Sequence, residues 1–373
     1  MDGLKLDKRN FLDKYWQRQP LLIPAALDPF IVPLSADELA GLALEEHVES
    51  RIIEYRDGQW CSIHGPFAEA DFKRSAPWTL LVQSVDHHVP PVAELRKLVD
   101  FIPQWRIDDV MMSYAVDGGS AGPHYDNYDV FLLQGEGERL WRLGQRCHRD
   151  TPKLSDSEPR IIEEFQCEQE YLLGSGDILY IPPGVAHWGI ARGECTTFSI
   201  GFRAPRVVDL ISRWADSVLE MTDASLFYAD STRPKDARPG EISTREIERA
   251  AELVRRTIAA DTDGRWFGEL VTEAKGDFRL DHTELESARQ RLGQPHVVTL
   301  SPAAKLAWMQ QSMGITVFAN GECRVFSSLI LDTLVTLCDS WRISNASLAN
   351  ALVQDECAEL LEFLLDTGCI DVK

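Results

Sequence analysis

The stretch GPHYDNYDVFLLQGEGERLWRLG places His124 and Asp126 one residue apart, ahead of an apolar run that is typical of a β-strand. We expect the pair to lie in a strand, where alternate side chains point to one face and can share a metal ion. His148 and Asp150 repeat this spacing in GQRCHRDTPK, a polar stretch after a strand end that is typical of a loop. The context favours the first pair as metal ligands.

A third ligand is offered by His187 in GDILYIPPGVAHWG, where a strand ends in a Pro-Pro-Gly turn and the chain re-enters the sheet. Two histidines and one carboxylate occupy one face of an octahedron and leave three positions open, which suits Fe(II) with a bidentate co-substrate and O₂. Alternatively, the histidines are satisfied core residues of a barrel. Each histidine taken alone favours the alternative of a core residue. The three potential ligands taken together favour a metal centre.

Arg139 lies 15 residues after His124, in the apolar run ERLWRLG. A buried arginine is costly unless it is paired, and its planar guanidinium matches a carboxylate. We expect it to hold the distal carboxylate of 2-oxoglutarate, whose 2-oxo acid end would bind the metal. The alternative is an arginine at the barrel rim that pairs with Glu136 or Glu138.

Short apolar runs separated by Gly and Pro fill the chain from Val110 to Arg203, which predicts a β-sandwich or barrel. Upstream, RNFLDKYWQRQPLLI predicts an amphipathic helix that stops at Pro20 and a short strand after it. The run WTLLVQSVDHHVPP predicts a strand that ends at Asp86.

Helical patterns dominate after Pro205: RVVDLISRWADSVLEM and TREIERAAELVRRTI predict two amphipathic helices around the loop STRPKDARPGEIS. Further on, SPAAKLAWMQ, LILDTLVTLC and DECAELLEFLLDT predict helices, and Gly368 is a candidate C-terminal cap. Asn320-Gly321 within GITVFANGECRVF predicts a β-hairpin, because type I′ turns need positive φ at both positions. Helices with a small hairpin predict a winged-helix-like domain.

The charge balance argues against nucleic-acid binding, although winged helices often bind DNA. From Gly276 to Lys373 there are 13 acidic and 7 basic residues, and the whole chain carries a net charge of −21. Binding to DNA requires clustered Lys and Arg that replace counterions. The acidity either attracts basic partners by long-range steering or only keeps the protein soluble.

Cysteine usage and the absence of long apolar segments predict a cytoplasmic protein. The eight cysteines are scattered without a C-x-x-C pair, which fits a reducing compartment. The N-terminal sequence lacks the apolar core of a signal peptide, and no run approaches 18 apolar residues. We therefore expect no membrane span.

The pattern HYD…R…H in these stretches resembles the JmjC-type 2-oxoglutarate oxygenases. More narrowly, DDVMMSYAVDGGSAGPHYDNYDVFLLQG, FLDKYWQRQPLLI and LLVQSVDHHVP resemble the bacterial ribosomal oxygenases, the protein-arginine hydroxylases of the YcfD/RoxA type, over essentially the whole chain. The resemblance implies a mixed α+β chain in three parts. These are a JmjC/cupin double-stranded β-helix barrel with an N-terminal extension over 1–205, a helical dimerisation segment over 206–272, and a winged-helix-like domain over 273–373.

The resemblance also implies site residues and partners. Its metal ligands correspond to His124, Asp126 and His187, its 2-oxoglutarate-binding basic residue to Arg139, and an assisting polar residue to Ser199. The implied cofactors are Fe(II), 2-oxoglutarate and O₂, and no side chain is expected to act as a general acid or base. The implied substrate is a basic ribosomal protein, by analogy the sixteenth of the large subunit, hydroxylated at an arginine β-carbon by a homodimeric enzyme.

A substrate arginine would need an acidic or aromatic slot near the metal. Asp117 could pair with its guanidinium, or it is an ordinary turn aspartate. Tyr128 could form part of the wall, or it belongs to the core. Two other functions stay open: a catalytically silent cupin-like scaffold for ribosome assembly, and an N-methyl-lysine demethylase with the same iron chemistry. The intact ligand set counts against the scaffold, and the sequence does not separate the demethylase.

Overall fold

The computed structural model describes residues 4–154, 160–203, 205–231, 238, 240–258, 263–292, 297–312 and 314–372. The chain divides into two compact units. The first comprises residues 1–204 with 301–303, and the second comprises residues 205–300 with 304–373. The three-domain division at 205 and 272 stays a prediction.

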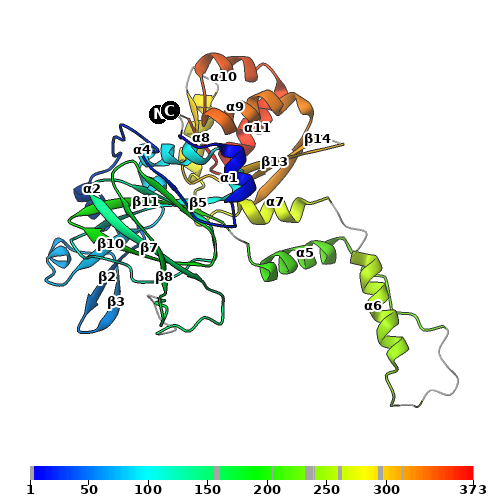
Figure 1. Ribbon diagram of the computed structural model, residues 1–373. Coiled ribbons are helices and arrows are strands. Elements are labelled where there is room, and N and C mark those ends of the chain that lie inside the picture. Colours follow the sequence, from blue (N-terminus) through cyan, green and yellow to red (C-terminus); the bar gives the residue numbers. More distant parts are fainter. Residues whose placement is uncertain are drawn as a thin grey trace. The chain divides into compact units, whose positions relative to one another are not determined.

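Two antiparallel sheets form the first unit (Figure 1). The larger sheet has, in order, the strands β1 (Leu21–Ile23), β9 (Ile178–Ile181), β6 (Val130–Gln134), β11 (Cys195–Phe202), β5 (Ile107–Ala115), β4 (Trp78–Val82), β2 (Ser50–Arg56) and β3 (Gln59–His64). The smaller sheet has the strands β10 (Val185–Arg192), β7 (Glu138–Arg146) and β8 (Cys167–Leu173).

An apolar core joins the facing surfaces of the two sheets. Leu132 and Leu179 of the larger sheet pack in one cluster with Trp141 and Leu143 of β7 and Val185 of β10. The opposite face of the larger sheet buries Phe131, Phe198 and neighbours against the N-terminal extension. The predicted sandwich or barrel and the mixed α+β class are confirmed.

Short helices and turns cover the larger sheet on its outer face. These are α1 (Lys8–Lys14), α2 (Ala36–Leu42), α3 (Val85–His88), α4 (Pro90–Ala93), and the 3₁₀ turns η1 (Glu69–Phe72), η2 (Glu94–Val99) and η3 (Gln104–Arg106). The helix and short strand predicted on either side of Pro20 are found as α1 and β1, but α1 ends at Lys14 and not at Pro20. Phe11 of α1 is completely buried and makes an edge-to-face contact with Tyr180, with ring centroids 4.8 Å apart.

The predicted strand end at Asp86 is wrong, because β4 ends at Val82 and Asp86 lies in α3. The Asp86 carboxylate is buried, accepts the backbone N–H of Val110 (2.9 Å) and pairs with Arg96 (3.2 Å). A buried carboxylate must find such partners. The chain therefore turns after Val82 so that Asp86 reaches them.

A buried polar network ties the extension to the barrel at Asp129. Its Oδ1 accepts the hydroxyl of Tyr180 (2.5 Å), and its Oδ2 accepts the side-chain amide of Gln17 (2.9 Å) and Nη2 of Arg106 (3.3 Å). Burial raises the pKa of Asp129, which its hydrogen bonds oppose. Asp129 stands three residues after Asp126, so this network anchors the chain beside the candidate ligands.

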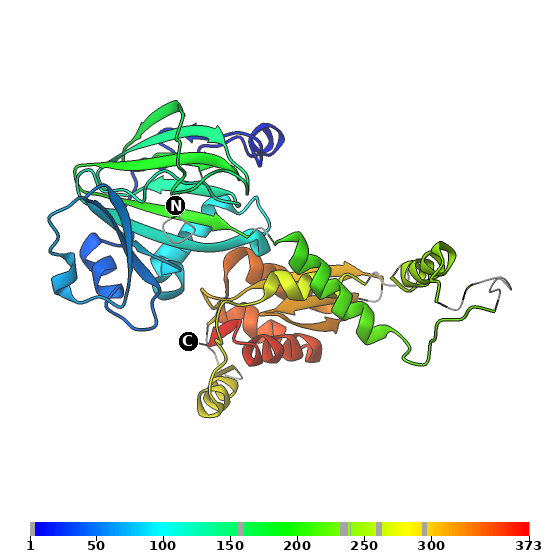
Figure 2. The ribbon, with the colours of Figure 1, turned by 90° about the horizontal axis from the view of Figure 1, so that it is seen from below.

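The second unit combines helices with two three-stranded sheets (Figure 2). Its helices are α5 (Val207–Met221), α6 (Thr244–Ile258), α7 (Arg265–Thr272), α8 (His282–Leu292), α9 (Leu331–Ser340), α10 (Asn345–Ala351) and α11 (Asp355–Asp366), with the turn η4 (Ser328–Ile330). The sheets run β16 (Arg342–Ile343), β12 (Val298–Leu300), β17 (Ile370–Val372), and β13 (Leu306–Gln311), β14 (Gly314–Ala319), β15 (Glu322–Phe326). Leucines of α9 and α11 pack with Ile315 and Val317 of β14 in one core.

The expected helices α5, α6, α9 and α11 are confirmed, and most of the loop predicted between α5 and α6 lies outside the described residues. The helix predicted over SPAAKLAWMQ is wrong, since it contains strand β13, paired with β14 from Leu306↔Ala319 to Gln311↔Gly314. The Asn320-Gly321 turn is confirmed, with φ of 47° and 88°, and Gly368 has φ 70° after α11. None of the helices in the described ranges is long and apolar enough to cross a membrane.

Asp129→Ala is expected to lower the free energy of unfolding by about 3 kcal/mol, because it leaves the Tyr180 hydroxyl and the Gln17 amide buried without their acceptor. Urea denaturation measures the loss. Asp100→Ala is the control, since Asp100 is exposed and only pairs with Lys8, and it should cost less than about 1 kcal/mol. Equal stability of the two variants would contradict the role of the network.

Candidate functional site

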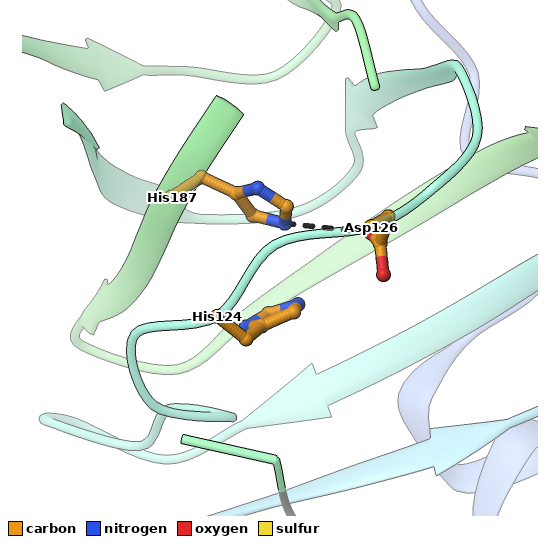
Figure 3. A group of neighbouring side chains, drawn as sticks. All are labelled: His124, Asp126 and His187. Carbon is orange, nitrogen blue, oxygen red and sulfur yellow. Dashed lines mark ion pairs between the residues drawn. The ribbon is translucent and has the colours of Figure 1, made fainter. Parts of the chain in front are cut away.

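Side chains from two segments far apart in the sequence converge at one end of the barrel (Figure 3). His124 and Asp126 come from the segment between β5 and β6, and His187 comes from β10 (Figure 3). Their potential ligand atoms all lie within 4.8 Å of one another, and Nε2 of His187 is 3.6 Å from Oδ2 of Asp126. The imidazole centroids of His124 and His187 are 4.3 Å apart. Among the described residues this is the one group of three or more potential metal ligands.

The expected strand at His124 and Asp126 is wrong. His124 forms an isolated bridge with His187, in which each backbone N–H donates to the other carbonyl (3.0 and 2.8 Å). Asp126 already lies in a loop, where its carbonyl accepts the backbone N–H of Gly184 (2.8 Å). The pair is thus positioned by the partner segment around β10 rather than by strand alternation.

Backbone carbonyls fix the orientation of both imidazoles. The Nδ1–H of His124 donates to the carbonyl of Gly122 (2.9 Å), and that of His187 donates to the carbonyl of Val185 (3.0 Å). A carbonyl only accepts, so both rings keep Nε2 as the unprotonated nitrogen of the neutral form. Burial, with His124 nearby, lowers the pKa of His187 to about 4. The ring is therefore neutral at physiological pH and its Nε2 lone pair can bind a metal.

The donor set fits a facial triad. Two Nε2 atoms and one carboxylate oxygen from one side are the ligands that a non-haem Fe(II) site uses, with open positions left for other molecules. The pair of His148 and Asp150 lies in a loop, as predicted, and both side chains are exposed with their nearest atoms 3.8 Å apart. No third ligand joins that pair among the described residues.

Arg139 is buried inside the barrel, with 4% of its surface exposed. Its Nε and Nη2 have no hydrogen-bond partner within the described ranges. The alternative of a rim arginine paired with Glu136 or Glu138 is disfavoured, since Arg139 is buried and its Nε and Nη2 contact neither carboxylate in the described part of the chain. A buried guanidinium with open donors is suited to bind an anion.

The register of the smaller sheet places Arg139 on the same face as His187. His187 pairs with Leu143, Arg139 pairs with Ala191, and the residues at 139, 141 and 143 alternate inward. Four residues along a strand span about 13 Å. The candidate metal ligand His187 and the guanidinium of Arg139 therefore face the same interior at two levels of one sheet.

The remaining predicted residues take different places. Ser199 of β11 is buried and points into the barrel from the larger sheet, without a hydrogen bond to Arg139 in the described structure. Tyr128 is 41% exposed, so it is not a core residue, and the charge of Asp126 raises its pKa. Asp117 is exposed and its Oδ1 accepts the backbone N–H of Gly193 (2.8 Å), as a turn aspartate does.

Sequence reasoning missed residues that shape the site. Gly184 donates to the Asp126 carbonyl, and its φ of 77° explains why glycine ends the Pro-Pro-Gly turn. Gly122 has φ 80°, and a Cβ there would lie 2.4 Å from Ile161. Trp141 fills the barrel between Arg139 and Leu143. The turn glycines were visible in the sequence, but their partners were not.

Comparisons with known proteins agree on one group. The JmjC domain family matches residues 94–210. The chain is 39% identical to the ribosomal protein uL16 3-hydroxylase of Escherichia coli (strain K12) over 282 residues, 74% of each chain. It is 30% identical to a probable ribosomal oxygenase of Haemophilus influenzae, over 96% of this chain and 93% of that protein. The structure of YcfD, a ribosomal oxygenase from Escherichia coli in complex with cobalt and 2-oxoglutarate, matches with TM-score 0.84 and 33% identity, over 100% of this chain and 99% of that one.

His187→Ala is expected to weaken Fe(II) binding by at least about a hundredfold while the fold is kept, because an open site depends on all three protein ligands. Anaerobic calorimetric titration measures the affinity, and circular dichroism checks the fold. His148→Ala is the matched control and should bind the metal as the unmodified protein does. A larger loss in the His148 variant than in the His187 variant would mean that the wrong pair has been chosen.

Proposed function

This chain belongs to the family of JmjC ribosomal oxygenases, and on that premise we propose that it hydroxylates an arginine side chain of a large-subunit ribosomal protein, using Fe(II), 2-oxoglutarate and O₂. By analogy with the Escherichia coli relative, the substrate is ribosomal protein uL16, hydroxylated at position 3 of a residue. That this residue is an arginine rests on the family resemblance. One observation carries the proposal. Three potential metal ligands converge, and one of them, His187, lies on the same inner face as a buried guanidinium with open donors.

Each side chain has a defined task in this proposal. His124, Asp126 and His187 hold the iron through two Nε2 atoms and a carboxylate, and the carbonyls of Gly122 and Val185 keep both rings in place. Bound iron supplies the oxidation of a C–H bond to an alcohol by O₂, while 2-oxoglutarate loses CO₂ and becomes succinate.

The other tasks concern the two organic substrates. Arg139 binds the distal carboxylate, and Ser199 faces the same interior from the larger sheet. No protein acid or base is required, and we assign none. On the substrate side we keep Asp117 and Tyr128 as candidates for contacts with the incoming arginine. One oxygen of Asp117 is engaged by Gly193, and its other oxygen makes no hydrogen bond within the described ranges. Tyr128 is half exposed beside Asp126, where it can form part of a wall.

The partner we propose is a basic protein in the cytoplasm, where ribosomes are assembled. The net charge of −21 attracts a basic ribosomal protein and disfavours direct binding to nucleic acid. Both statements rest on the charge of the chain and on the family.

The silent scaffold and the lysine demethylase are disfavoured for different reasons. A silent scaffold would not need three convergent ligands or a buried arginine whose donors stay open. A lysine demethylase would share these groups, so the argument against it comes from the relatives that match most of this chain. A ribosomal protein hydroxylase and a probable ribosomal oxygenase match over 74% and 96% of it, whereas bifunctional lysine-specific demethylases and histidyl-hydroxylases match over 31–48%.

Intact-mass analysis of ribosomal proteins from cells with and without this protein tests the reaction and the substrate together. We expect one protein to be heavier by one oxygen, roughly sixteen daltons, only when the unmodified protein is present. Cells that carry His187→Ala provide the control and should lack the shift. A lost methyl mass would favour the demethylase, and unchanged masses throughout would favour the scaffold.

Arg139→Ala should raise the Michaelis constant for 2-oxoglutarate about tenfold to a hundredfold, since a charge-assisted contact of about 1.5–3 kcal/mol is lost. Arg139→Lys should have a smaller effect, because lysine keeps the charge and loses the bidentate geometry. Succinate formation at varied 2-oxoglutarate measures both. An unchanged Michaelis constant in the alanine variant would remove Arg139 from the co-substrate site.

We also propose that the chain forms a homodimer through α5 and α6. The exposed apolar residues of this segment are Val207, Val208, Ile211, Leu219 and Met221 on α5, Leu226, Phe227 and Tyr228 after it, and Ile247, Leu253 and Val254 on α6. Contiguous exposed apolar surface of this kind is typical of an interface, and a two-fold dimer is the commonest closed assembly.

Light scattering coupled to size exclusion should report twice the chain mass at micromolar concentration. Ile211→Glu, on the apolar face of α5, should shift the protein to the monomer because it places a charge in the interface. Asp216→Lys changes an exposed residue on the opposite face of the helix and should leave the dimer intact. A monomeric unmodified protein would overturn the assignment.

A further inference from the structure

Trp141 occupies the middle of the buried face of β7, between Arg139 and Leu143. Its ring centroid is 6.0 Å from that of His187, and the Cζ atom of Arg139 is 5.9 Å from the Trp141 ring. The indole therefore lies between the metal end and the guanidinium end of the same face. Any linear ligand that spans these two ends must pass over it.

The indole N–H of Trp141 is a second donor without a partner. The side chain is 6% exposed, and Nε1 has no hydrogen-bond acceptor within the described ranges, as is true of Nε and Nη2 of Arg139. Its apolar neighbours in the barrel, Leu132 and Leu179 among them, offer no acceptor. Buried donors are almost always satisfied in folded proteins, so three open donors on neighbouring side chains indicate a common acceptor.

The position of the ring is fixed by its strand partner. Trp141 pairs with Gly189 of β10, and a Cβ at Gly189 would lie 2.8 Å from the Cη2 and Cζ3 atoms of the ring. Glycine here lets the indole lie directly against the backbone of β10. The indole ring is thus held against β10 on the inner face of the smaller sheet.

We propose that Trp141 is a co-substrate-binding residue, whose indole N–H donates a hydrogen bond to the distal carboxylate of 2-oxoglutarate beside Arg139. This rests on the proposed function, because it takes Arg139 as the anchor of that carboxylate. A carboxylate has two oxygens with about four lone-pair positions, enough to accept all three open donors. The preference for a diacid would then depend on a neutral donor as well as on the guanidinium.

Calorimetric titration of the full-length protein loaded with Zn²⁺, a redox-inactive ion, tests the inference without turnover. Trp141→Phe keeps an aromatic ring and removes the N–H, and we expect it to raise the Kd for 2-oxoglutarate about tenfold. Pyruvate carries the same 2-oxo acid end without a distal carboxylate, so its Kd should not change. Trp78→Phe is the matched control, since Trp78 is also 6% exposed but packs in the core on the outer face of the larger sheet.

The indole resonance of Trp141 provides a second readout in the unmodified protein. In a nitrogen–proton correlation spectrum of the ¹⁵N-labelled, Zn²⁺-loaded protein, the resonance that Trp141→Phe removes identifies the group. It should move downfield on addition of 2-oxoglutarate and stay in place with pyruvate, because only the diacid supplies the acceptor. If the phenylalanine variant is too unstable for titration, sequence-specific assignment of the indole resonance in the unmodified protein keeps this measurement available.

The outcomes separate this inference from the function on which it rests. If Arg139→Ala binds 2-oxoglutarate as tightly as the unmodified protein does, the proposed co-substrate site fails and the inference fails with it. If Arg139→Ala binds weakly while Trp141→Phe binds normally, or the indole resonance does not move, only the inference is overturned. Equal weakening of 2-oxoglutarate and pyruvate would also overturn it, since a general packing defect would explain that result.

Discussion

Two reciprocal backbone hydrogen bonds between His124 and His187 hold the candidate site together. They join the segment that leads into β6 to strand β10, and they bring both imidazoles onto one side of the barrel. The Asp126 loop follows directly and is fixed by Gly184 and, three residues later, by the buried Asp129 network. The positions of the ligands therefore depend on backbone hydrogen bonds and on a buried carboxylate.

The barrel interior combines apolar packing with polar groups that the protein leaves open. Leu132, Leu143 and Leu179 exclude water from the face that also contains Arg139 and Trp141. Buried donors without acceptors lower stability, so a fold that retains them has a use for them. The same burial strengthens any charge-assisted contact that an anion makes there, because the effective dielectric is lower than in water.

The sequence predicted those features that local pattern decides. The Asn320-Gly321 hairpin, the helix before Pro20 and the amphipathic helices α5 and α6 follow from turn chemistry and periodicity. The segment Leu306–Gln311 was misassigned because its strand character comes from pairing with β14, and its buried and exposed residues alternate only over six positions. Similarly, His124 and Asp126 were found by residue type, but the bridge to His187, 63 positions away, has no local signal.

Arg139 and Trp141 lie on the same strand, but only Arg139 can be identified as a candidate functional residue from the sequence. An arginine in an apolar run conflicts with burial, and that conflict marks it as functional. A tryptophan in an apolar run is expected to be buried, so the sequence alone predicts that Trp141 is a core residue. Its N–H becomes informative only in the structure, where the hydrogen-bond acceptors around it can be identified. Gly189 adds the missing constraint, since a glycine in a strand interior weakens the strand unless something must lie close to the backbone. Here that group is the indole ring, so the sequence at both positions is explained by one contact across β7 and β10.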